Sequence, residues 1–189
     1  MAELSKAEGE PRIRIQSLTP ELEESTEDCI REIIRAQRND PAAEPKAQYR
    51  AGAIGKSCQR FPNEDFKVAV DEDANMVVGT IRLRHLKEGV GQLMRFGVRP
   101  TFEGKGIGSQ LYNDIVNFAK ANQYKQIYLT TEGNDAHKKA LGMYERRGFK
   151  QMNLADVPKE DLKLFLSGDD NLEHIQEGKT VIYKLELEQ

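Results

Sequence analysis

The chain has 189 residues and a formal net charge of −3, and residues of both signs are mixed along its length. A chain of this length builds one sizeable core, so we expect a flexible lead over residues 1–11 and a single domain over residues 12–189. It has no basic stripe for a nucleic-acid backbone and no apolar run long enough to cross a bilayer, so we expect a cytoplasmic protein with no nucleic-acid or membrane partner.

The first third of the chain predicts a strand, a helix and an irregular segment. Polar and apolar residues alternate over residues 12–18, with the two-residue period of a half-buried strand. Residues 19–37 follow as a helix, with Thr19 as N-cap and Pro20 at the first helical position. Its apolar residues fall on one stripe: Leu22, Cys29, Ile30, Ile33 and Ile34. Prolines and glycines interrupt residues 38–62, which we interpret as a broken helix or lid that is either a connector or faces the substrate.

The remainder of the chain predicts strands that first run together and then alternate with helices. Two strands joined by a polar turn form a hairpin, and a glycine-rich turn separates the next strand from an amphipathic helix. The expected strands are residues 66–70, 76–86, 92–98, 125–133, 149–154 and 180–187, and the expected helices are residues 107–120, 134–148 and 158–165.

This order of elements predicts an α/β fold of the mixed α+β kind. We expect a central mixed, mostly antiparallel sheet of about seven strands flanked by helices, with one parallel pairing across the helix that follows the glycine-rich turn. The last strand is a candidate for pairing with a second copy, so a monomer and a homodimer are both expected possibilities.

Three glycines within five positions, Gly104, Gly106 and Gly108, lie where this helix begins. Without a Cβ, glycine lets backbone N–H groups approach an anion closely, and a helix N-terminus favours negative charge. Lys105 precedes the second glycine, which excludes a Walker-A loop, and the spacing G-x-G-x-G departs from the dinucleotide pattern G-x-G-x-x-G. A nucleotide, a coenzyme A pyrophosphate and a turn that only packs strand against helix remain open.

The cysteines and histidines suggest no metal site. Cys29 and Cys58 lie outside any C-x-x-C pattern, so we interpret both as ordinary thiols. His85, His137 and His174 show no H-E-x-x-H spacing, which disfavours a zinc hydrolase.

Two motifs within residues 92–149 resemble the acetyl-CoA-binding core of the GNAT superfamily of N-acetyltransferases. Residues 103–108 match the superfamily's loop, Gln/Arg-x-x-Gly-x-Gly/Ala, with Glu103 in place of Gln or Arg. Residues 140–149 match its later signature, Ala-x-x-x-Tyr-Glu-x-x-Gly-Phe. The hairpin of residues 70–83 is also similar to the superfamily's second and third strands.

The resemblance implies a splayed pair of strands, residues 94–98 and 126–131, that holds acetyl-CoA as cosubstrate. The implied contacts with pantetheine are Phe96, Gly97 and Val98, and a main-chain N–H near Val98 is expected to polarise the thioester carbonyl. The implied contacts with the pyrophosphate are Glu103, Gly104, Lys105, Gly106, Ile107, Gly108 and Ser109. His137, which replaces an asparagine of many relatives, is a further candidate contact. We expect the Glu103 carboxylate to point to solvent.

The resemblance also implies an N-acetyltransferase reaction, in which an amine attacks the thioester directly through a tetrahedral intermediate. Tyr144 is the candidate general acid that protonates the departing thiolate. Gln92 and Met94 occupy the positions where many relatives carry a basic Glu, so Glu132 and His85 are the candidate bases.

The expected acceptor is the amine of a small molecule, an amino acid or a peptide. Arg95 is a candidate for orienting a carboxylate on that acceptor. Because the usual carboxylate is absent from the strand, an acyl-CoA-binding sensor without turnover is the alternative function. A dinucleotide oxidoreductase is a third interpretation, which predicts binding of NAD or FAD but not of coenzyme A.

Overall fold

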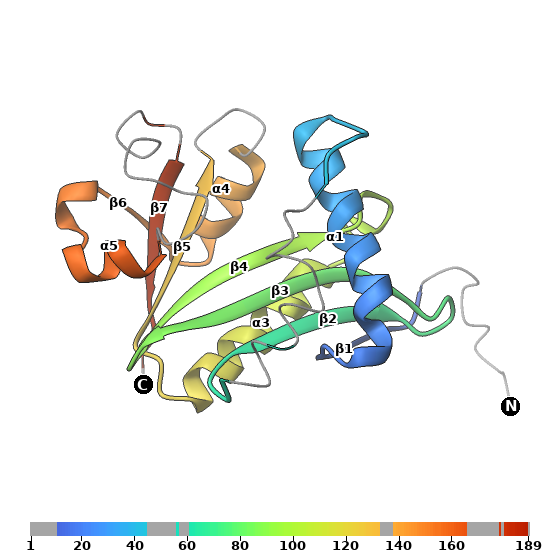
Figure 1. Ribbon diagram of the computed structural model, residues 1–189, viewed down its shortest axis with the longest axis horizontal. Helices are drawn as coiled ribbons and strands as arrows, with labels where there is room; N and C mark the ends of the chain where they lie inside the picture. Colours follow the sequence, from blue (N-terminus) through green and yellow to red (C-terminus); the bar gives the residue numbers. More distant parts are fainter. Residues whose placement is uncertain are drawn as a thin grey trace, which may run out of the picture.

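The computed structural model describes residues 11–44, 56, 61–132, 138–165, 178 and 180–188. Most of the expected lead and of the irregular segment 38–62, together with Cys58, His137 and His174, lies outside the described residues. Within the described residues, seven strands form one sheet in the order β1-β2-β3-β4-β5-β7-β6 (Figure 1).

The sheet is mixed and mostly antiparallel, as predicted. Its strands are β1 Ile13–Ser17, β2 Asp65–Asp71, β3 Met76–Lys87, β4 Val90–Val98, β5 Gln126–Glu132, β6 Lys150–Met152 and β7 Thr180–Glu186. Among these described strands, β4 and β5 run parallel, and every other pair of neighbours runs antiparallel. The predicted parallel pairing across the helix after the glycine-rich turn is therefore confirmed.

Helices cover both faces of this sheet (Figure 1). They are α1 Glu23–Arg38, α3 Ile107–Ala121, α4 Lys138–Arg146 and α5 Lys159–Phe165. α1 packs Cys29 and Ile33 against valines of β2 and β3, whereas α3 and α4 share a core on the other face. On β5, Tyr128 belongs to the core under α5 and Leu129 to the core of α3 and α4. Successive side chains of β5 therefore point to opposite faces of the sheet and belong to the cores on those two faces.

The first turn of α1 differs from the prediction. Pro20–Leu22 form a 3₁₀ turn, η1, and the α-helix begins only at Glu23. Thr19 is extended and is the N-cap of this turn, with Pro20 at the first helical position as predicted, but its side chain makes no capping bond to the backbone. The Leu22 N–H donates instead to the Thr19 carbonyl at 3.0 Å. This short-range bond satisfies a donor that a hydroxyl cap would otherwise serve.

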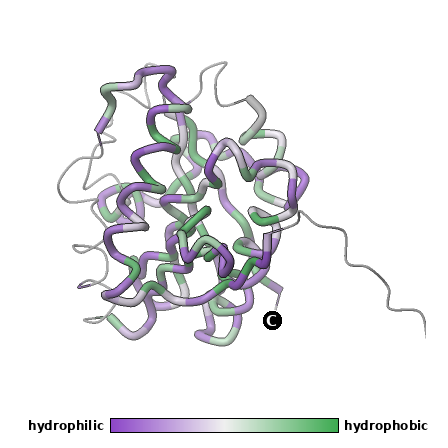
Figure 2. Tube along the Cα trace, turned by 90° about the vertical axis from the view of Figure 1, so that its right-hand side faces the viewer, coloured by the Kyte–Doolittle hydropathy of each residue, from purple (hydrophilic) through white to green (hydrophobic). Residues whose placement is uncertain are grey.

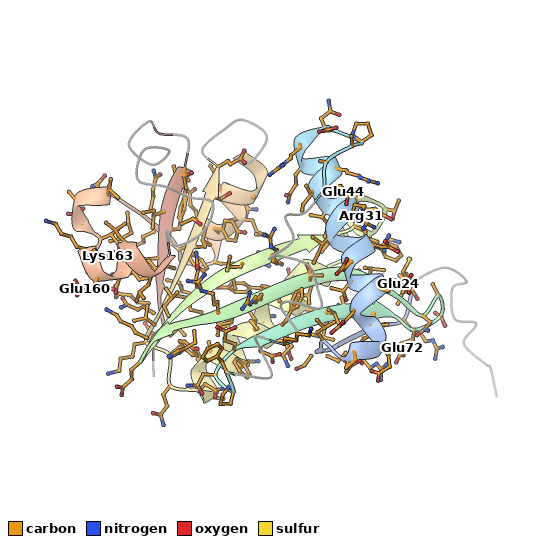
Figure 3. All side chains as sticks on the ribbon, in the orientation of Figure 1. Glu24, Arg31, Glu44, Glu72, Glu160 and Lys163 are labelled. Carbon is orange, nitrogen blue, oxygen red and sulfur yellow. The ribbon has the colours of Figure 1, made fainter. Side chains whose placement is uncertain are left out.

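The C-terminal half of α1 is braced by charged side chains. Arg31 Nε lies 2.9 Å from Glu44 Oε2, and both side chains are labelled in Figure 3. Arg35 also pairs with Glu44. Asn39 takes the left-handed conformation at φ 49° and ends the helix there. These ion pairs join α1 to the segment that directly follows it.

The last strand does not lie at an edge of the sheet. β7 pairs with β5 on one side and with β6 on the other, so both sides of its backbone are occupied. Residues 182–184 are therefore paired on both sides and offer no edge to a second copy, which was one of the two possibilities named above. The sheet edges are β1 and β6.

Apolar residues are distributed over many short segments. Figure 2 shows hydrophobic and hydrophilic stretches alternating along the described trace. None of the described helices is both long and apolar enough to span a bilayer. The apolar side chains meet instead in the layers beside the sheet, where Ile81, Leu111 and Ile115 are fully buried.

Buried tyrosines predict a loss of stability in alkali. Burial raises the pKa of Tyr144 and of Tyr128 from 10.0 to about 12, and the carboxylate of Asp161 beside Tyr128 contributes to its rise. Burial also raises the pKa of Tyr124. A phenol that stays neutral in the folded state stabilises the fold fully below the unfolded pKa, and this contribution is lost as the pH rises through the folded pKa.

We therefore expect the free energy of unfolding in urea to fall steeply between pH 10 and 12. In this range the phenols ionise in the unfolded chain but stay neutral in the folded one. Phenolate absorbance, followed on the same samples, should rise together with unfolding. Complete ionisation of the tyrosines near pH 10 in a protein that remains folded would contradict this expectation.

Candidate active site

The parallel strands β4 and β5 separate beyond their first residues. Residues 90–92 pair with residues 126–128, and no further pairing of the two strands follows in the described chain. Figure 1 shows the strands starting side by side and then diverging. β5 continues beside β7, whereas the outer half of β4 has no ladder partner on the side of β5. The predicted splay is therefore confirmed.

A cleft of about 180 Å³ lies between the separated strands and is flanked by α1 and α4. Its walls include Ile33 of α1, Thr80 of β3, Arg95 of β4, Thr131 of β5 and Tyr144 of α4. This volume is smaller than the ~300–1,000 Å³ of sites that enclose a drug-sized ligand. The cleft therefore suits the reactive end of a longer ligand together with a small second molecule.

The end of β4 shapes one wall of this cleft. Phe96 lines it, and the Phe96 ring centroid lies 6.3 Å from that of Tyr144. A Cβ on Gly97 would lie 2.8 Å from Ile33 Cγ2, so glycine is what allows α1 to approach the strand this closely. Val98 pairs with Gly79 of β3 and so anchors the strand end. The predicted pantetheine segment thus borders the cleft through Phe96.

A bulge in β4 brings Arg95 into the cleft wall. The register between β3 and β4 shifts by one residue between Thr80 and Arg82 of β3. Arg95 has a φ of 52°, which lies in the left-handed region, and Thr80 Oγ1 donates to its carbonyl at 2.7 Å. Bulges of this kind bend a strand and redirect side chains near functional sites.

Tyr144 presents its phenol to the same cleft. The residue is 9% exposed, and its ring packs edge-on against Phe149 at 5.7 Å between centroids. Burial raises the pKa of the hydroxyl to about 12, and the charge of Arg147 opposes part of this rise. Within the part of the chain that the structure describes, this hydroxyl makes no hydrogen bond. It is therefore able to donate to a molecule bound in the cleft.

The glycine-rich turn forms an open cradle at the start of α3. Gly104 and Gly106 have φ values of 78° and 77°, and a Cβ on either would meet nothing within 4 Å. Backbone conformation, and not lack of space, is what requires glycine at these positions. Gly106 is the N-cap of α3 and the helix has no side-chain cap. Glu103 is exposed, in line with the expectation that it points to solvent.

Arg147 adds positive charge to this cradle and was missed in the sequence analysis. Its Nη2 donates to Ser109 Oγ at 2.8 Å, and its guanidinium carbon lies 4.6 Å from the centroid of the Tyr112 ring. In the sequence, Arg147 lies within the later signature of residues 140–149, but at a position where the superfamily pattern accepts any residue. The fold brings it to the first turn of α3, where it favours a bound anion.

Residues 26–149 match the model of the acetyltransferase (GNAT) family. The chain belongs to this family. The matched range contains the diverging strands β4 and β5, which we call the fork, together with the cleft, Tyr144 and the glycine cradle. The match to the GNAT family therefore covers the whole candidate site.

Curated relatives match part of this GNAT-family chain. The human N-acetylaspartate synthetase is 36% identical over 98 residues, which is 50% of this chain and 30% of that protein. N-acetylaspartate synthetase of Xenopus tropicalis is 36% identical over 98 residues, with 34% of its length covered. The chain thus spans about a third of the length of the curated relatives it matches.

Solved structures share the fold over nearly the whole chain. A GNAT-family acetyltransferase of Staphylococcus aureus Mu50 superposes with a TM-score of 0.75 at 21% identity, and covers 94% of this chain and 100% of that one. The PaiA N-acetyltransferase of Thermoplasma acidophilum, in complex with coenzyme A, gives a TM-score of 0.69 at 16% identity, with 93% and 99% covered. The predicted GNAT-like fold is therefore confirmed.

The acetyltransferase fold does not bring all the predicted site residues together. His85 pairs with Gly91 at the closed end of the fork, and its Nδ1 lies 3.1 Å from the Tyr124 hydroxyl. His85 is five positions along β3 from Thr80 of the cleft wall, which is roughly 17 Å along an extended strand. Glu132 ends β5, next to Thr131 of the cleft wall, and is exposed. His137 lies outside the described residues.

Proposed function

We propose that this acetyltransferase moves an acetyl group from acetyl-CoA to the amine of a small acceptor, within the cleft between β4 and β5. The observation that carries the proposal is the confirmed splay, which leaves the outer half of β4 without a strand partner and opens the cleft beside the Tyr144 phenol. Free backbone groups at a strand edge are what an amide-containing chain such as pantetheine can pair with.

The residues present fit coenzyme A. Gly104 and Gly106 have left-handed backbone conformations, and a Cβ on either would meet no atom within 4 Å. They lie at the N-terminus of a 15-residue helix, a position that suits a pyrophosphate. Arg147 and Lys105 would add charge attraction. Phe96, Gly97 and Val98 would hold the pantetheine along β4. Acetyl-CoA supplies the activated acyl carbon and the thiolate leaving group, and the PaiA neighbour carries coenzyme A in its crystal structure.

Tyr144 acts in this proposal as the proton donor to the leaving sulfur. Because burial raises its pKa to about 12, the phenol stays protonated at every pH at which the protein is folded well. Its acidity is too weak for it to lose the proton before the sulfur becomes basic, so donation accompanies cleavage of the thioester. The main-chain N–H groups near Val98 are proposed to stabilise the carbonyl oxygen as charge develops on it.

Of the two candidate bases, we propose Glu132. Among the described residues that line the cleft, none is a carboxylate or a histidine. Glu132 directly follows Thr131 of the cleft wall, whereas His85 lies at the closed end of the fork. We propose that Glu132 accepts the proton of the acceptor ammonium through water, which leaves a neutral nucleophilic amine.

The small acceptor is supported by the size of the cleft and by the relatives. The name of N-acetylaspartate synthetase states a product in which an amino acid carries the acetyl group, and this protein is 36% identical to the chain over 98 residues. An amino acid is therefore the acceptor class that we favour over a peptide.

The test is acceptor-dependent release of coenzyme A thiol, measured with acetyl-CoA and a panel of amino acids and simple amines. We expect thiol release that rises with acceptor concentration and is matched by acetylated product in a mass spectrum. Tight binding of acetyl-CoA without acceptor-dependent release would contradict this proposal and favour the acyl-CoA sensor instead.

A further inference from the structure

Arg147 places its guanidinium against the side of α3. Its Nη2 donates to Ser109 Oγ at 2.8 Å, and its guanidinium carbon lies 4.6 Å from the centroid of the Tyr112 ring. Ser109 and Tyr112 are three residues apart and so share one face of the helix. The backbone beneath the side chain is also held, because the Arg147 N–H donates to the Tyr144 carbonyl at 3.0 Å. The charge of Arg147 therefore has a defined place beside the first turns of α3.

This guanidinium keeps donors for a ligand. A guanidinium has five N–H donors, and the Ser109 hydroxyl accepts from one of them. The residue is half-buried, so an anion from solution can reach it. Among the residues that the structure describes, no carboxylate forms an ion pair with Arg147. Other described arginines do pair with a carboxylate, namely Arg12, Arg14, Arg31, Arg35, Arg82 and Arg99.

Arg147 lies beside the glycine cradle and not within it. Ser109 and Gln110 donate their N–H groups to the Gly106 carbonyl at 3.0 and 3.1 Å, so these two groups stay inside the helix. The open turn formed by Gly104 and Gly106 precedes the first residue of α3. An anion at the end of the helix and an anion at Arg147 therefore occupy two neighbouring but separate places. A single ligand that fills both must carry two separate phosphate groups.

We propose that Arg147 binds the ribose 3′-phosphate of coenzyme A while the glycine cradle binds the pyrophosphate. Coenzyme A carries both groups on one ribose, with the pyrophosphate on the 5′ oxygen and a phosphate monoester on the 3′ oxygen. A monoester carries a charge of about −1.5 to −2 near neutral pH, and a guanidinium donates two parallel hydrogen bonds to it. This inference rests on the proposed binding of coenzyme A at the cradle, and it names the residue that recognises the 3′-phosphate.

Ser109 and Tyr112 are the positioning residues for this contact. Stacking on the ring and the bond to the hydroxyl fix the plane of the guanidinium, so less side-chain freedom is lost when a phosphate binds. Burial raises the pKa of Tyr112 above its ordinary value, against the charge of Arg147. Both partners are therefore neutral near pH 7, and they orient the cation without cancelling its charge.

The first experiment compares coenzyme A with 3′-dephospho-coenzyme A on the wild-type protein by titration calorimetry. The two ligands differ only in the 3′-phosphate. Neither carries an acetyl group, so the measurement is independent of acetyl transfer. We expect the dissociation constant to be at least about 10-fold lower for coenzyme A, the factor that a hydrogen bond between charged groups supports.

The second experiment changes the residue. Arg147→Gln removes the charge, and Arg147→Lys retains the charge without the planar pair of donors. In Arg147→Gln we expect the two dissociation constants to come within about twofold of each other, while that of 3′-dephospho-coenzyme A changes less than about threefold. Arg147→Lys should give an intermediate ratio. Arg146→Gln, at the exposed arginine that ends α4, is the matched control and should keep the wild-type ratio.

The outcomes separate this inference from the proposed function. Circular dichroism first establishes that each variant is folded. Equal weakening of both ligands in Arg147→Gln would place the guanidinium on the pyrophosphate and overturn the assignment to the 3′-phosphate. A wild-type ratio in Arg147→Gln, or equal affinities of the wild-type protein for the two ligands, would overturn it as well. Failure of the wild-type protein to bind either ligand would instead overturn the cradle, and with it the proposed function.

Discussion

Replacing Tyr144 by phenylalanine is expected to lower kcat for acetyl transfer by about 100-fold, with little change in the affinity for coenzyme A. The change removes only the hydroxyl, so the ring contacts with Phe96 and Phe149 remain. The departing thiolate then loses its proton donor in a cleft where no other acidic group lies among the described lining residues. Steady-state thiol release gives kcat, and titration calorimetry with coenzyme A gives the dissociation constant.

Tyr183→Phe is the matched control for this variant. The Tyr183 hydroxyl donates to Glu145 at 3.1 Å and does not line the cleft. Its removal should leave kcat within about twofold of wild type while it weakens the fold by about 1 kcal/mol. A Tyr144→Phe variant that turns over as fast as the control would show that this phenol is only a packing residue.

Replacing Gly106 by valine is expected to raise the dissociation constant for coenzyme A by about 10-fold or more. Gly106 has a φ of 77°, and a β-branched residue there costs about 1–2 kcal/mol or more, so the loop relaxes to another conformation. The N–H groups that start α3 then no longer converge on one anion. Titration calorimetry with coenzyme A measures the loss, and circular dichroism checks that the fold is retained.

Gly108→Ala tests whether the conformation, and not any added bulk in the loop, is responsible. Gly108 does not have a positive φ, and its Cβ would meet Phe96 and Val98 at an ordinary distance of 3.6 Å. This variant should bind coenzyme A nearly as well as wild type, and alanine in the helix should stabilise the fold by up to about 1 kcal/mol. Equal losses of affinity in the two variants would contradict the cradle.

The parts of the fold that could be predicted from the sequence are those that local chemistry determines. The two-residue alternation near Ile13 and the apolar stripe of α3 are visible in consecutive residues, and both elements are confirmed. The glycine spacing located the cradle, because a left-handed turn leaves few residue choices. The splay of β4 from β5 followed from the resemblance and not from any property of the strands themselves.

The parts that could not be predicted depend on contacts between distant segments. The bulge at Arg95 arises from its pairing with β3, and nothing in the sequence of β4 marks it. Arg147 reaches Ser109 only because α4 packs beside α3. The position of β7 between β5 and β6 likewise depends on strand order, which short-range patterns do not contain. Short-range patterns in the sequence therefore predicted the elements, but not the bulge, the strand order or the contacts between distant segments.

A crystal structure of the chain with coenzyme A is the most direct test of the central claim that the fork between β4 and β5 is the site of acetyl transfer. The account predicts the pyrophosphate over residues 104–109, pantetheine along the end of β4, and the sulfur in the cleft beside Tyr144. Coenzyme A bound elsewhere, with the cleft between β4 and β5 unoccupied, would contradict it.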